Sequence, residues 1–117
     1  MDARTRGQWG EERAAAFLRR RFWRILERNF SCRMGEIDII ACNRHYIIFV
    51  EVKLRQDASF AEAREFVSYP KQQRIIAAAS LWLQRHPTSL QPRFDVIEIY
   101  DGGGRIRIEQ IENAFEA

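Results

Sequence analysis

The sequence predicts a single α/β domain, in which helices flank a central sheet. Residues 35–55, 93–100 and 105–111 carry apolar side chains at a period of two, which is typical of strands. Residues 7–22 and 70–85 instead repeat apolar side chains at helical spacing. The chain of 117 residues is large enough for one hydrophobic core but not for two. We therefore expect one domain over residues 1–117, with residues 1–6 as a flexible basic arm.

The composition favours a packed globule that works in the cytoplasm. Hydrophobic residues make up 46% of the chain and aromatic residues 12%. No apolar run approaches the roughly 20 residues of a membrane span, and the N-terminus has no apolar signal core. We expect no membrane partner, and we expect Cys32 and Cys42 to be reduced thiols because they lack a CxxC spacing. The net charge of +3 permits a polyanionic partner.

The first expected helix, residues 7–22, carries an acid on its apolar face. Glu11 lies on the same stripe as the apolar residues three, four, seven and eleven positions later. Such an acid either belongs to a functional site or is a first-turn carboxylate that the helix dipole favours. The helix pattern alone leaves both explanations open.

Residues 23–30 are expected to begin the sheet, and residues 31–34 to form a connection. The stretch from Gly35 to Arg55 then gives the strongest strand signal, as two strands joined by a turn within residues 42–46. If the loop is Arg44-His45, antiparallel pairing places Asp38 directly opposite Glu51. The same register places residue 36, a glutamate, opposite residue 53, a lysine.

Two facing carboxylates need a counter-charge or a proton. Their side-chain roots would be about 5 Å apart, and like charges repel by about 4 kcal/mol at 4 Å for an effective dielectric of 20. Mg²⁺ prefers oxygen ligands and is often held by one or two carboxylates. Lys53 leaves the same face of its strand as Glu51. A divalent cation beside an amine suggests phosphodiester chemistry.

An ordered set of short motifs extends this interpretation. They are Gly7-x-x-Gly10-Glu11, Gly35-Glu36-Ile37-Asp38, Val50-Glu51-Val52-Lys53-x-Arg55, Lys71-x-x-Arg74 and Arg93-Phe94-Asp95-Val96-Ile97. Together they resemble the PD-(D/E)xK nuclease superfamily, and within it a small bacterial family, the YraN-like predicted endonucleases, related to archaeal Holliday-junction resolvases. The resemblance runs from Gly7 to about Tyr100 and departs from the family at Phe60-Ala61, where Phe-Gly is usual. It implies a restriction-endonuclease-like core with a mixed central sheet flanked by helices.

The resemblance also implies roles for particular residues. Asp38 and Glu51 would bind Mg²⁺, or Mn²⁺, with help from the Val52 carbonyl. Glu11 would be an auxiliary acid that holds a second metal or orients a water, and Lys53 would lie beside the nucleophilic water. Basic side chains would hold the DNA backbone: Lys71, Arg74, Arg55, Arg4 and Arg6. The implied substrate is branched or single-stranded DNA, and a homodimer is plausible because related enzymes cut two strands.

The remaining segments complete the predicted fold. Residues 56–69 give the weakest pattern and could form a loop that closes over a substrate. Pro70 suits the first turn of a helix that runs to about residue 85 and places Lys71 on its inner stripe. Residues 88–92 form a loop before the strand 93–100. The glycines at 102–104 form a turn rather than a phosphate loop, because no Lys-Ser/Thr follows. Residues 105–111 read as an exposed edge strand.

Three alternatives remain on the sequence alone. The chain could have the same fold but be a non-catalytic nucleic-acid-binding domain that serves a partner protein. It could be a structural or interaction protein whose hairpin charges simply pair with one another. A zinc site formed by Cys32, Cys42 and His45 is the weakest, because the spacing is unhelpful and no fourth ligand lies nearby.

Overall fold

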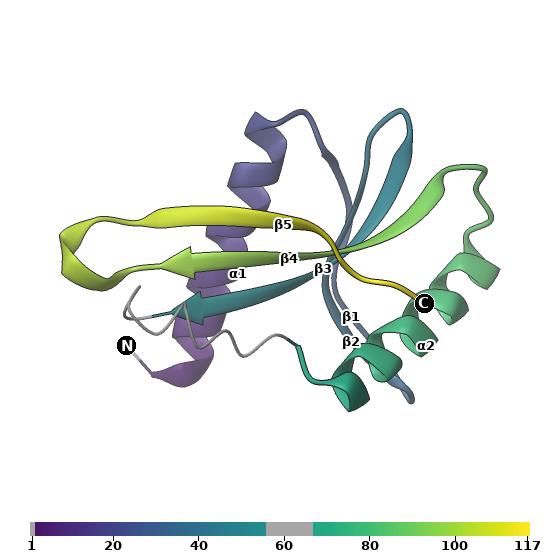
Figure 1. Ribbon diagram of the computed structural model, residues 1–117, viewed down its shortest axis with the longest axis horizontal. Helices are drawn as coiled ribbons and strands as arrows, with labels where there is room; N and C mark the ends of the chain where they lie inside the picture. Colours follow the sequence, from purple (N-terminus) through teal and green to yellow (C-terminus); the bar gives the residue numbers. More distant parts are fainter. Residues whose placement is uncertain (1, 56–66) are drawn as a thin grey trace.

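The computed structural model describes residues 2–55 and 67–117, and it confirms the predicted α/β fold (Figure 1). In these residues two helices flank one five-stranded sheet of order β1-β2-β3-β4-β5. Only β3 and β4 are parallel, so the sheet is mixed, and the arrangement is compatible with a restriction-endonuclease-like core. The elements are α1 (Ala3–Arg20), β1 (Arg24–Cys32), β2 (Gly35–Cys42), β3 (Tyr46–Arg55), α2 (Tyr69–Arg85), β4 (Gln91–Tyr100), the 3-10 helix η2 (Gly102–Gly104) and β5 (Arg107–Phe115).

Each helix buries one face of the sheet. Helix α2 lies in the crossover between the parallel strands β3 and β4 and covers one face, while α1 covers the other (Figure 1). The core on the α2 side includes Phe49, Phe94, Ile75 and Trp82. The core on the α1 side includes Leu18, Ile39, Val50, Ile97 and Ile99. Strand β3 is therefore apolar on both faces, as its unbroken apolar run predicts.

The hairpin has the predicted register. Strands β2 and β3 pair from Cys42↔Ile47 to Ile39↔Val50, and the Asn43 amide donates to the Tyr46 carbonyl at 3.0 Å. Two residues, Arg44 and His45, remain as the loop. Continuing this register by one residue brings residue 38 opposite residue 51, as the sequence predicted.

The N-terminal arm was predicted wrongly. Helix α1 begins at Ala3, because the Asp2 side chain caps it by accepting a hydrogen bond from the Thr5 amide at 2.8 Å. Residue 6, an arginine, is further tied to Asp101 by an ion pair of 2.8 Å. The helix also ends at Arg20, two residues earlier than predicted. The possible substrate-covering loop within residues 56–69 falls mostly on residues 56–66, which lie outside the described residues.

The C-terminal strand is longer than predicted and is fastened by a buried acid. Strand β5 continues to Phe115, and its register with β4 shifts between Phe94 and Val96. Asp95 is fully buried there and accepts hydrogen bonds from Arg93, from the Gln110 side chain and from the Asn113 amide, at 2.8–3.0 Å. Asp95 therefore satisfies the backbone at the irregularity and holds β5 against β4.

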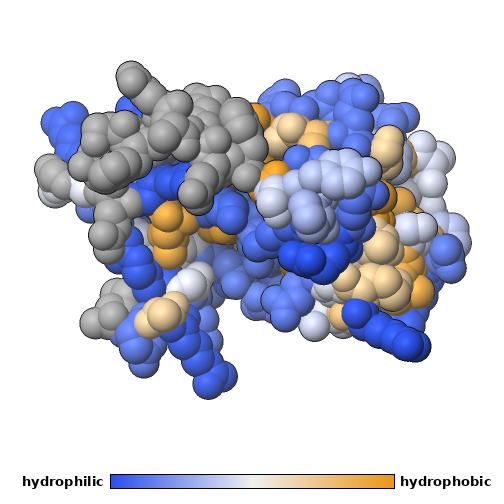
Figure 2. Space-filling view, turned by 60° about the horizontal axis from the view of Figure 1, so that its bottom comes forward, coloured by the Kyte–Doolittle hydropathy of each residue, from blue (hydrophilic) through white to orange (hydrophobic). Residues whose placement is uncertain are grey.

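On the face shown in Figure 2, the coloured residues are mainly hydrophilic, with smaller apolar areas between them. Neither described helix is long and apolar enough to cross a membrane.

Candidate functional site

The two predicted carboxylates meet where β2 and β3 stop pairing. Beyond Ile39↔Val50 the ladder ends, and the Asp38 Oδ2 atom accepts the hydrogen bond of the Val52 amide at 2.8 Å. The Asp38 side chain thus accepts the hydrogen bond of a β3 amide at a point where the backbone of β2 no longer pairs with β3. This contact orients the carboxyl group of Asp38, and Glu51 lies on the adjacent strand.

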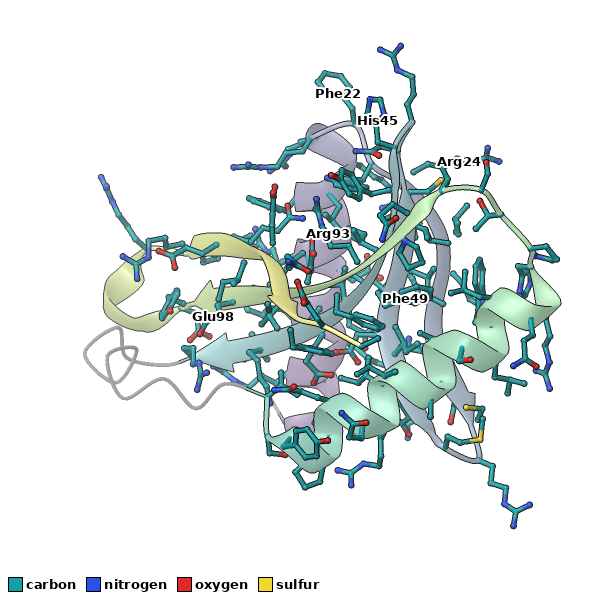
Figure 3. The ribbon with its side chains drawn as sticks, turned by 45° about the vertical axis from the view of Figure 1, so that its right-hand side comes forward. Phe22, Arg24, His45, Phe49, Arg93 and Glu98 are labelled. Carbon is teal, nitrogen blue, oxygen red and sulfur yellow. The ribbon has the colours of Figure 1, made fainter. Side chains whose placement is uncertain are left out.

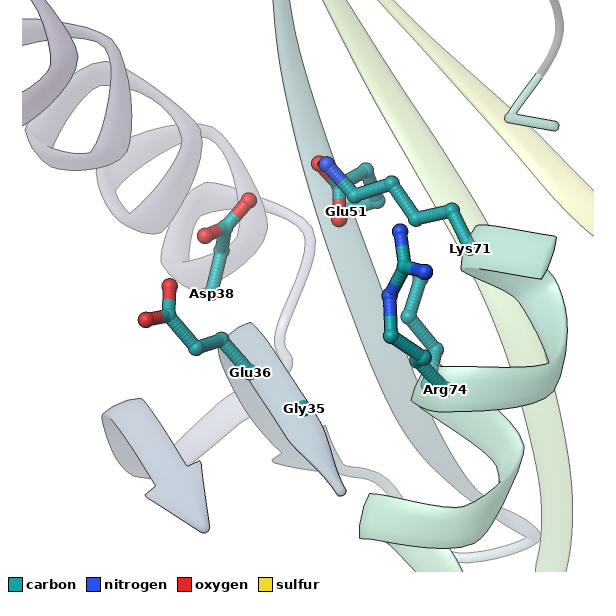
Figure 4. A pocket seen from close by; sticks show the side chains of 7 residues that line it. Gly35, Glu36, Asp38, Glu51, Lys71 and Arg74 are labelled. Carbon is teal, nitrogen blue, oxygen red and sulfur yellow. The ribbon is translucent and has the colours of Figure 1, made fainter. Parts of the chain in front are cut away.

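These carboxylates line a pocket of about 290 Å³ between the sheet and α2 (Figure 4). Strand β2 contributes Gly35, Glu36 and Asp38, β3 contributes Glu51, and α2 contributes Lys71, Arg74 and Ile75. The pocket therefore combines carboxylates from the sheet with cationic side chains from the first turns of a helix.

A close approach of α2 to β2 shapes the floor of this pocket. A Cβ atom on Gly35 would lie 3.0 Å from the Arg74 carbonyl oxygen and 3.1 Å from the Arg74 Cβ atom. Gly35 therefore lets the helix backbone approach the strand closely. Any larger residue would push Arg74 and the start of α2 away from the carboxylates.

Lys71 reaches from α2 to Glu51. Ser68 caps α2, with its Oγ atom 3.4 Å from the Lys71 amide, and Pro70 follows in the first turn. The Lys71 Nζ atom lies 2.9 Å from the Glu51 Oε1 atom, and the Glu51 side chain is 9% exposed (Figure 4). The inner stripe of α2 predicted where Lys71 points, but sequence reasoning missed Glu51 as its partner.

Within this pair of carboxyl groups, Asp38 has a raised pKa. Burial, and next the negative charge of Glu51, raise the pKa of Asp38 from 3.8 to about 7, although the Val52 amide opposes this shift. Glu11 raises the pKa of Asp38 further, while Lys71 lowers it. Near neutral pH this carboxyl group is therefore balanced between its neutral and ionised forms, as expected for an acid that lacks a sufficient counter-charge.

Glu11 lies on α1 and faces a neighbouring hollow, lined also by Glu12, Arg28 and Asn29. Its Oε1 atom is buried without a hydrogen bond, and the Arg28 Nη2 atom lies 3.8 Å away. Burial raises the pKa of Glu11. The structure thus brings Glu11 within electrostatic reach of Asp38 but does not include it among the residues that line the carboxylate pocket.

Lys53 and Arg55 lie farther along β3. Lys53 is paired in register with Glu98 of β4, does not line the carboxylate pocket, and makes no ion pair with the residues that the structure describes. The Arg55 Nε atom donates to the Glu98 Oε2 atom at 2.9 Å, and the Glu98 side chain is buried. Of the other predicted backbone-holding residues, Arg4 is exposed on α1.

The donor set fits a hard divalent cation better than zinc. Within residues 2–55 and 67–117, no three His, Cys, Asp or Glu side chains are grouped so that they could hold a metal. Two carboxylates and a nearby backbone carbonyl suit Mg²⁺, which keeps several water molecules as its remaining ligands. The zinc alternative fails because Cys32 pairs with Gly35 and Cys42 pairs with Arg24, at opposite ends of β2.

Comparisons with known proteins agree with one another. A family model described as "Uncharacterised protein family UPF0102" matches residues 10–99. A UPF0102 protein of Pelobacter propionicus is 48% identical over 119 residues, covering 98% of this chain and 85% of the relative. The UPF0102 protein STH1475 of Symbiobacterium thermophilum is 43% identical, covering 98% of this chain and 99% of the relative. The UPF0102 protein TTE1452 of Caldanaerobacter subterraneus is 37% identical, covering 100% and 97%.

Proposed function

The chain belongs to the UPF0102 family, and on the geometry of its pocket we propose that it is a metal-dependent endonuclease that hydrolyses phosphodiester bonds in DNA. The observation that carries this proposal is the Asp38–Glu51 pair, fixed across two strands, with the pKa of Asp38 raised to about 7. A carboxyl pair whose ionised form is disfavoured gains most from a bound divalent cation. Strained acids of this kind are enriched at functional sites.

Asp38 and Glu51 would hold Mg²⁺, or Mn²⁺, with the Val52 carbonyl nearby. When bound, the cation would supply Lewis-acid stabilisation of the charge that develops on the phosphate. The Val52 amide keeps Asp38 oriented, so its carboxyl group needs no rearrangement before binding.

Cationic side chains of α2 would receive the phosphate. Lys71 lies in the first turn of α2, where the positive end of the helix dipole favours an anion. Arg74 lines the same pocket one turn later. Lys71 is paired with Glu51 at 2.9 Å, and it would be free to contact the phosphate if Glu51 held a cation instead. Such backbone contacts give affinity with little sequence preference. We propose branched or single-stranded DNA as the substrate class because the resemblance to resolvases implies it.

Either of two lysines could stabilise the attacking water. Substituting each lysine in turn shows which of them has this role. Lys53 was assigned this role by the family resemblance, but Lys71 is the lysine that contacts Glu51. Lys53→Ala should abolish cleavage with little loss of DNA binding if Lys53 is catalytic. If Lys71→Ala abolishes cleavage while Lys53→Ala retains it, the role belongs to Lys71.

The whole proposal is tested by titrating Mg²⁺ and Mn²⁺ calorimetrically into the wild type and Asp38→Asn, with and without a short branched DNA. The same samples are assayed for cleavage of branched, single-stranded and duplex DNA. We expect binding that needs Asp38 and tightens with DNA, and cleavage that disappears in the variant. Absence of metal binding by the wild type in both conditions would contradict the proposal.

A non-catalytic nucleic-acid-binding domain is the second candidate. The observation that favours it is the Lys71–Glu51 ion pair, which neutralises one carboxylate without a metal. In that case DNA binding should be unchanged by chelators, and Asp38→Asn should bind DNA as well as the wild type.

Two further proposals rest on features outside this site. We propose a homodimer through β5, which lies at the edge of the sheet and pairs only with β4. Light scattering on the protein with and without DNA tests this. We also propose a cytoplasmic location, which suits the two free cysteines, Cys32 and Cys42.

A further inference from the structure

A third hollow, of about 480 Å³, lies where the turn after α1 meets the β2–β3 loop. Its described lining includes three arginines, an aromatic ring and an imidazole, but no carboxylate: Arg21, Phe22, Arg24, Arg44 and His45. We refer to these five residues as the arginine–aromatic surface. Phe22, His45 and Arg24 gather at one end of the molecule (Figure 3).

Phe22 is placed where the fold would prefer glycine. The Trp23 amide donates to the Leu18 carbonyl and the Phe22 amide to the Arg19 carbonyl, both at 3.0 Å. This is a Schellman motif, with Phe22 at the position that is usually glycine. Its φ of 70° is left-handed, which is unfavourable for a bulky residue.

The ring of Phe22 also contributes nothing to the core, because the residue is 91% exposed. A single exposed apolar residue is ordinary, but an exposed ring on a strained backbone is not. Strain of this kind persists where a side chain has a use outside the fold. The ring therefore indicates a surface that contacts a partner.

The arginines beside it lack acidic partners. Arg21, Arg24 and Arg44 form no ion pair within the described residues. The helix dipole explains cations in the last turn of α1. It does not explain Arg24, which begins β1, or Arg44, which lies in the β2–β3 loop. Three guanidinium groups without a carboxylate suit a partner with several negative charges.

Arg93 connects the residues beside this surface through several contacts. The Arg93 guanidinium lies 4.6 Å from the centroid of the Tyr46 ring and 5.4 Å from that of Trp23, and buried Asp95 holds it in place. Tyr46 is itself partly exposed and follows His45 directly. A second aromatic ring is therefore fixed close to the arginine–aromatic surface before any partner arrives.

We propose that the arginine–aromatic surface binds single-stranded nucleic acid, with a base stacked on Phe22 and phosphates on Arg24 and Arg44. Exposed rings interleaved with arginines are the means by which proteins bind single strands, because unpaired bases offer free faces and duplex bases do not. This surface is separate from the carboxylate pocket. Tyr46 and Glu51 are five residues apart on β3, which corresponds to about 17 Å. The inference goes beyond the proposed cleavage and needs no metal.

The decisive variant is Phe22→Gly, because glycine is favoured at this backbone position and the variant should fold at least as well as the wild type. Binding of labelled oligothymidylate and oligouridylate is measured by fluorescence anisotropy in EDTA, so that neither metal nor cleavage contributes. We expect Phe22→Gly to weaken binding by roughly 5- to 150-fold, as loss of one stacked base predicts. Phe22→Trp, which keeps a ring, should restore binding. Comparing the two oligonucleotides shows whether DNA or RNA is preferred.

The phosphate contacts are tested by salt dependence. The double variant Arg24→Gln/Arg44→Gln should lower the slope of log K against log salt by about 1.4, since each lost contact to a single strand removes about 0.7. Arg85→Gln, at the end of α2, removes an exposed arginine elsewhere and should leave the slope unchanged.

Several results would overturn the inference. One is equal binding by the wild type and Phe22→Gly, when the melting temperature of the variant is no lower than that of the wild type. Another is binding to heparin or to anionic phospholipid vesicles that matches oligonucleotide binding and does not need the ring, since the surface would then be a general polyanion or membrane contact. Loss of cleavage in Asp38→Asn with intact oligonucleotide binding would leave the inference standing, so its failure and that of the nuclease proposal are distinguishable.

Discussion

Replacing Asp38 by Asn should stabilise the metal-free protein at about pH 8 but much less at about pH 5. The Asp38 carboxyl group is partly buried beside Glu51, and burial is the largest cause that raises its pKa to about 7. Asn has nearly the same shape, can accept the Val52 amide through its Oδ1 atom, and has no charge. The substitution therefore removes the titration while it keeps the hydrogen bond.

The size of the effect follows from linkage. A carboxyl group whose pKa is higher in the folded protein binds its proton more tightly there, so the stability that it contributes is fully present below its unfolded pKa. That stability is lost as the pH rises from the unfolded value of 3.8 to the folded value of about 7. The shift of roughly 3 units corresponds to roughly 4 kcal/mol, of which about 3 kcal/mol is lost between pH 5 and pH 8.

Urea denaturation in EDTA at both pH values gives the free energy of unfolding directly. The stability difference between Asp38→Asn and the wild type should grow by about 3 kcal/mol from pH 5 to pH 8. Glu116→Gln, which neutralises an exposed acid, is the control and should show no such growth. If Asp38→Asn and the wild type lose stability in parallel, the carboxyl pair is not strained. Added Mg²⁺ should restore wild-type stability at pH 8 but not alter the variant.

Three further substitutions test how the fold supports the pocket. Gly35→Ala should lower the free energy of unfolding by about 1–3 kcal/mol, because its Cβ atom would meet the backbone of Arg74, and it should weaken metal binding as α2 shifts; unchanged stability in urea would show that the approach is not tight. Asp95→Ala should cost about 3–5 kcal/mol, since it leaves the partly buried Arg93 guanidinium without its partner; hydrogen exchange should localise the loss to β5. Leu18→Ala, at a fully buried position, should cost about 2–5 kcal/mol by calorimetry without changing oligonucleotide affinity.

Short-range patterns predicted the parts of the site that depend on local geometry. The two-residue loop fixed the hairpin register, which ends at Ile39↔Val50 and leaves Asp38 and Glu51 as the next residues on the two strands. The inner stripe of α2 placed Lys71 toward the sheet. Both results follow from periodicity within one element or one hairpin.

Contacts between distant elements could not be predicted in this way. The Lys71–Glu51 pair depends on how closely α2 approaches β2, which Gly35 sets through tertiary packing. The role of Asp95 depends on the left-handed backbone of Asn113, 18 residues away. The start of α1 was different, because Asp2 is a usual capping residue and gave a signal that could have been used.

The parallel pairing of β3 with β4 has a consequence for how the molecule folds. Every pair across this seam joins residues 45 apart in sequence, since Tyr46 pairs with Gln91 and Arg55 with Tyr100. The neighbouring hairpins close over short loops, whereas pairing β3 with β4 must close a long one. The chain loses the conformational entropy of this long loop before it gains any contact between the two strands. Lys71 lies on α2, within the long connection between these two strands, whereas Asp38 and Glu51 lie on the local β2–β3 hairpin. We therefore expect the hairpin to bring the two carboxylates together early in folding, and Lys71 to join them only when the long connection closes.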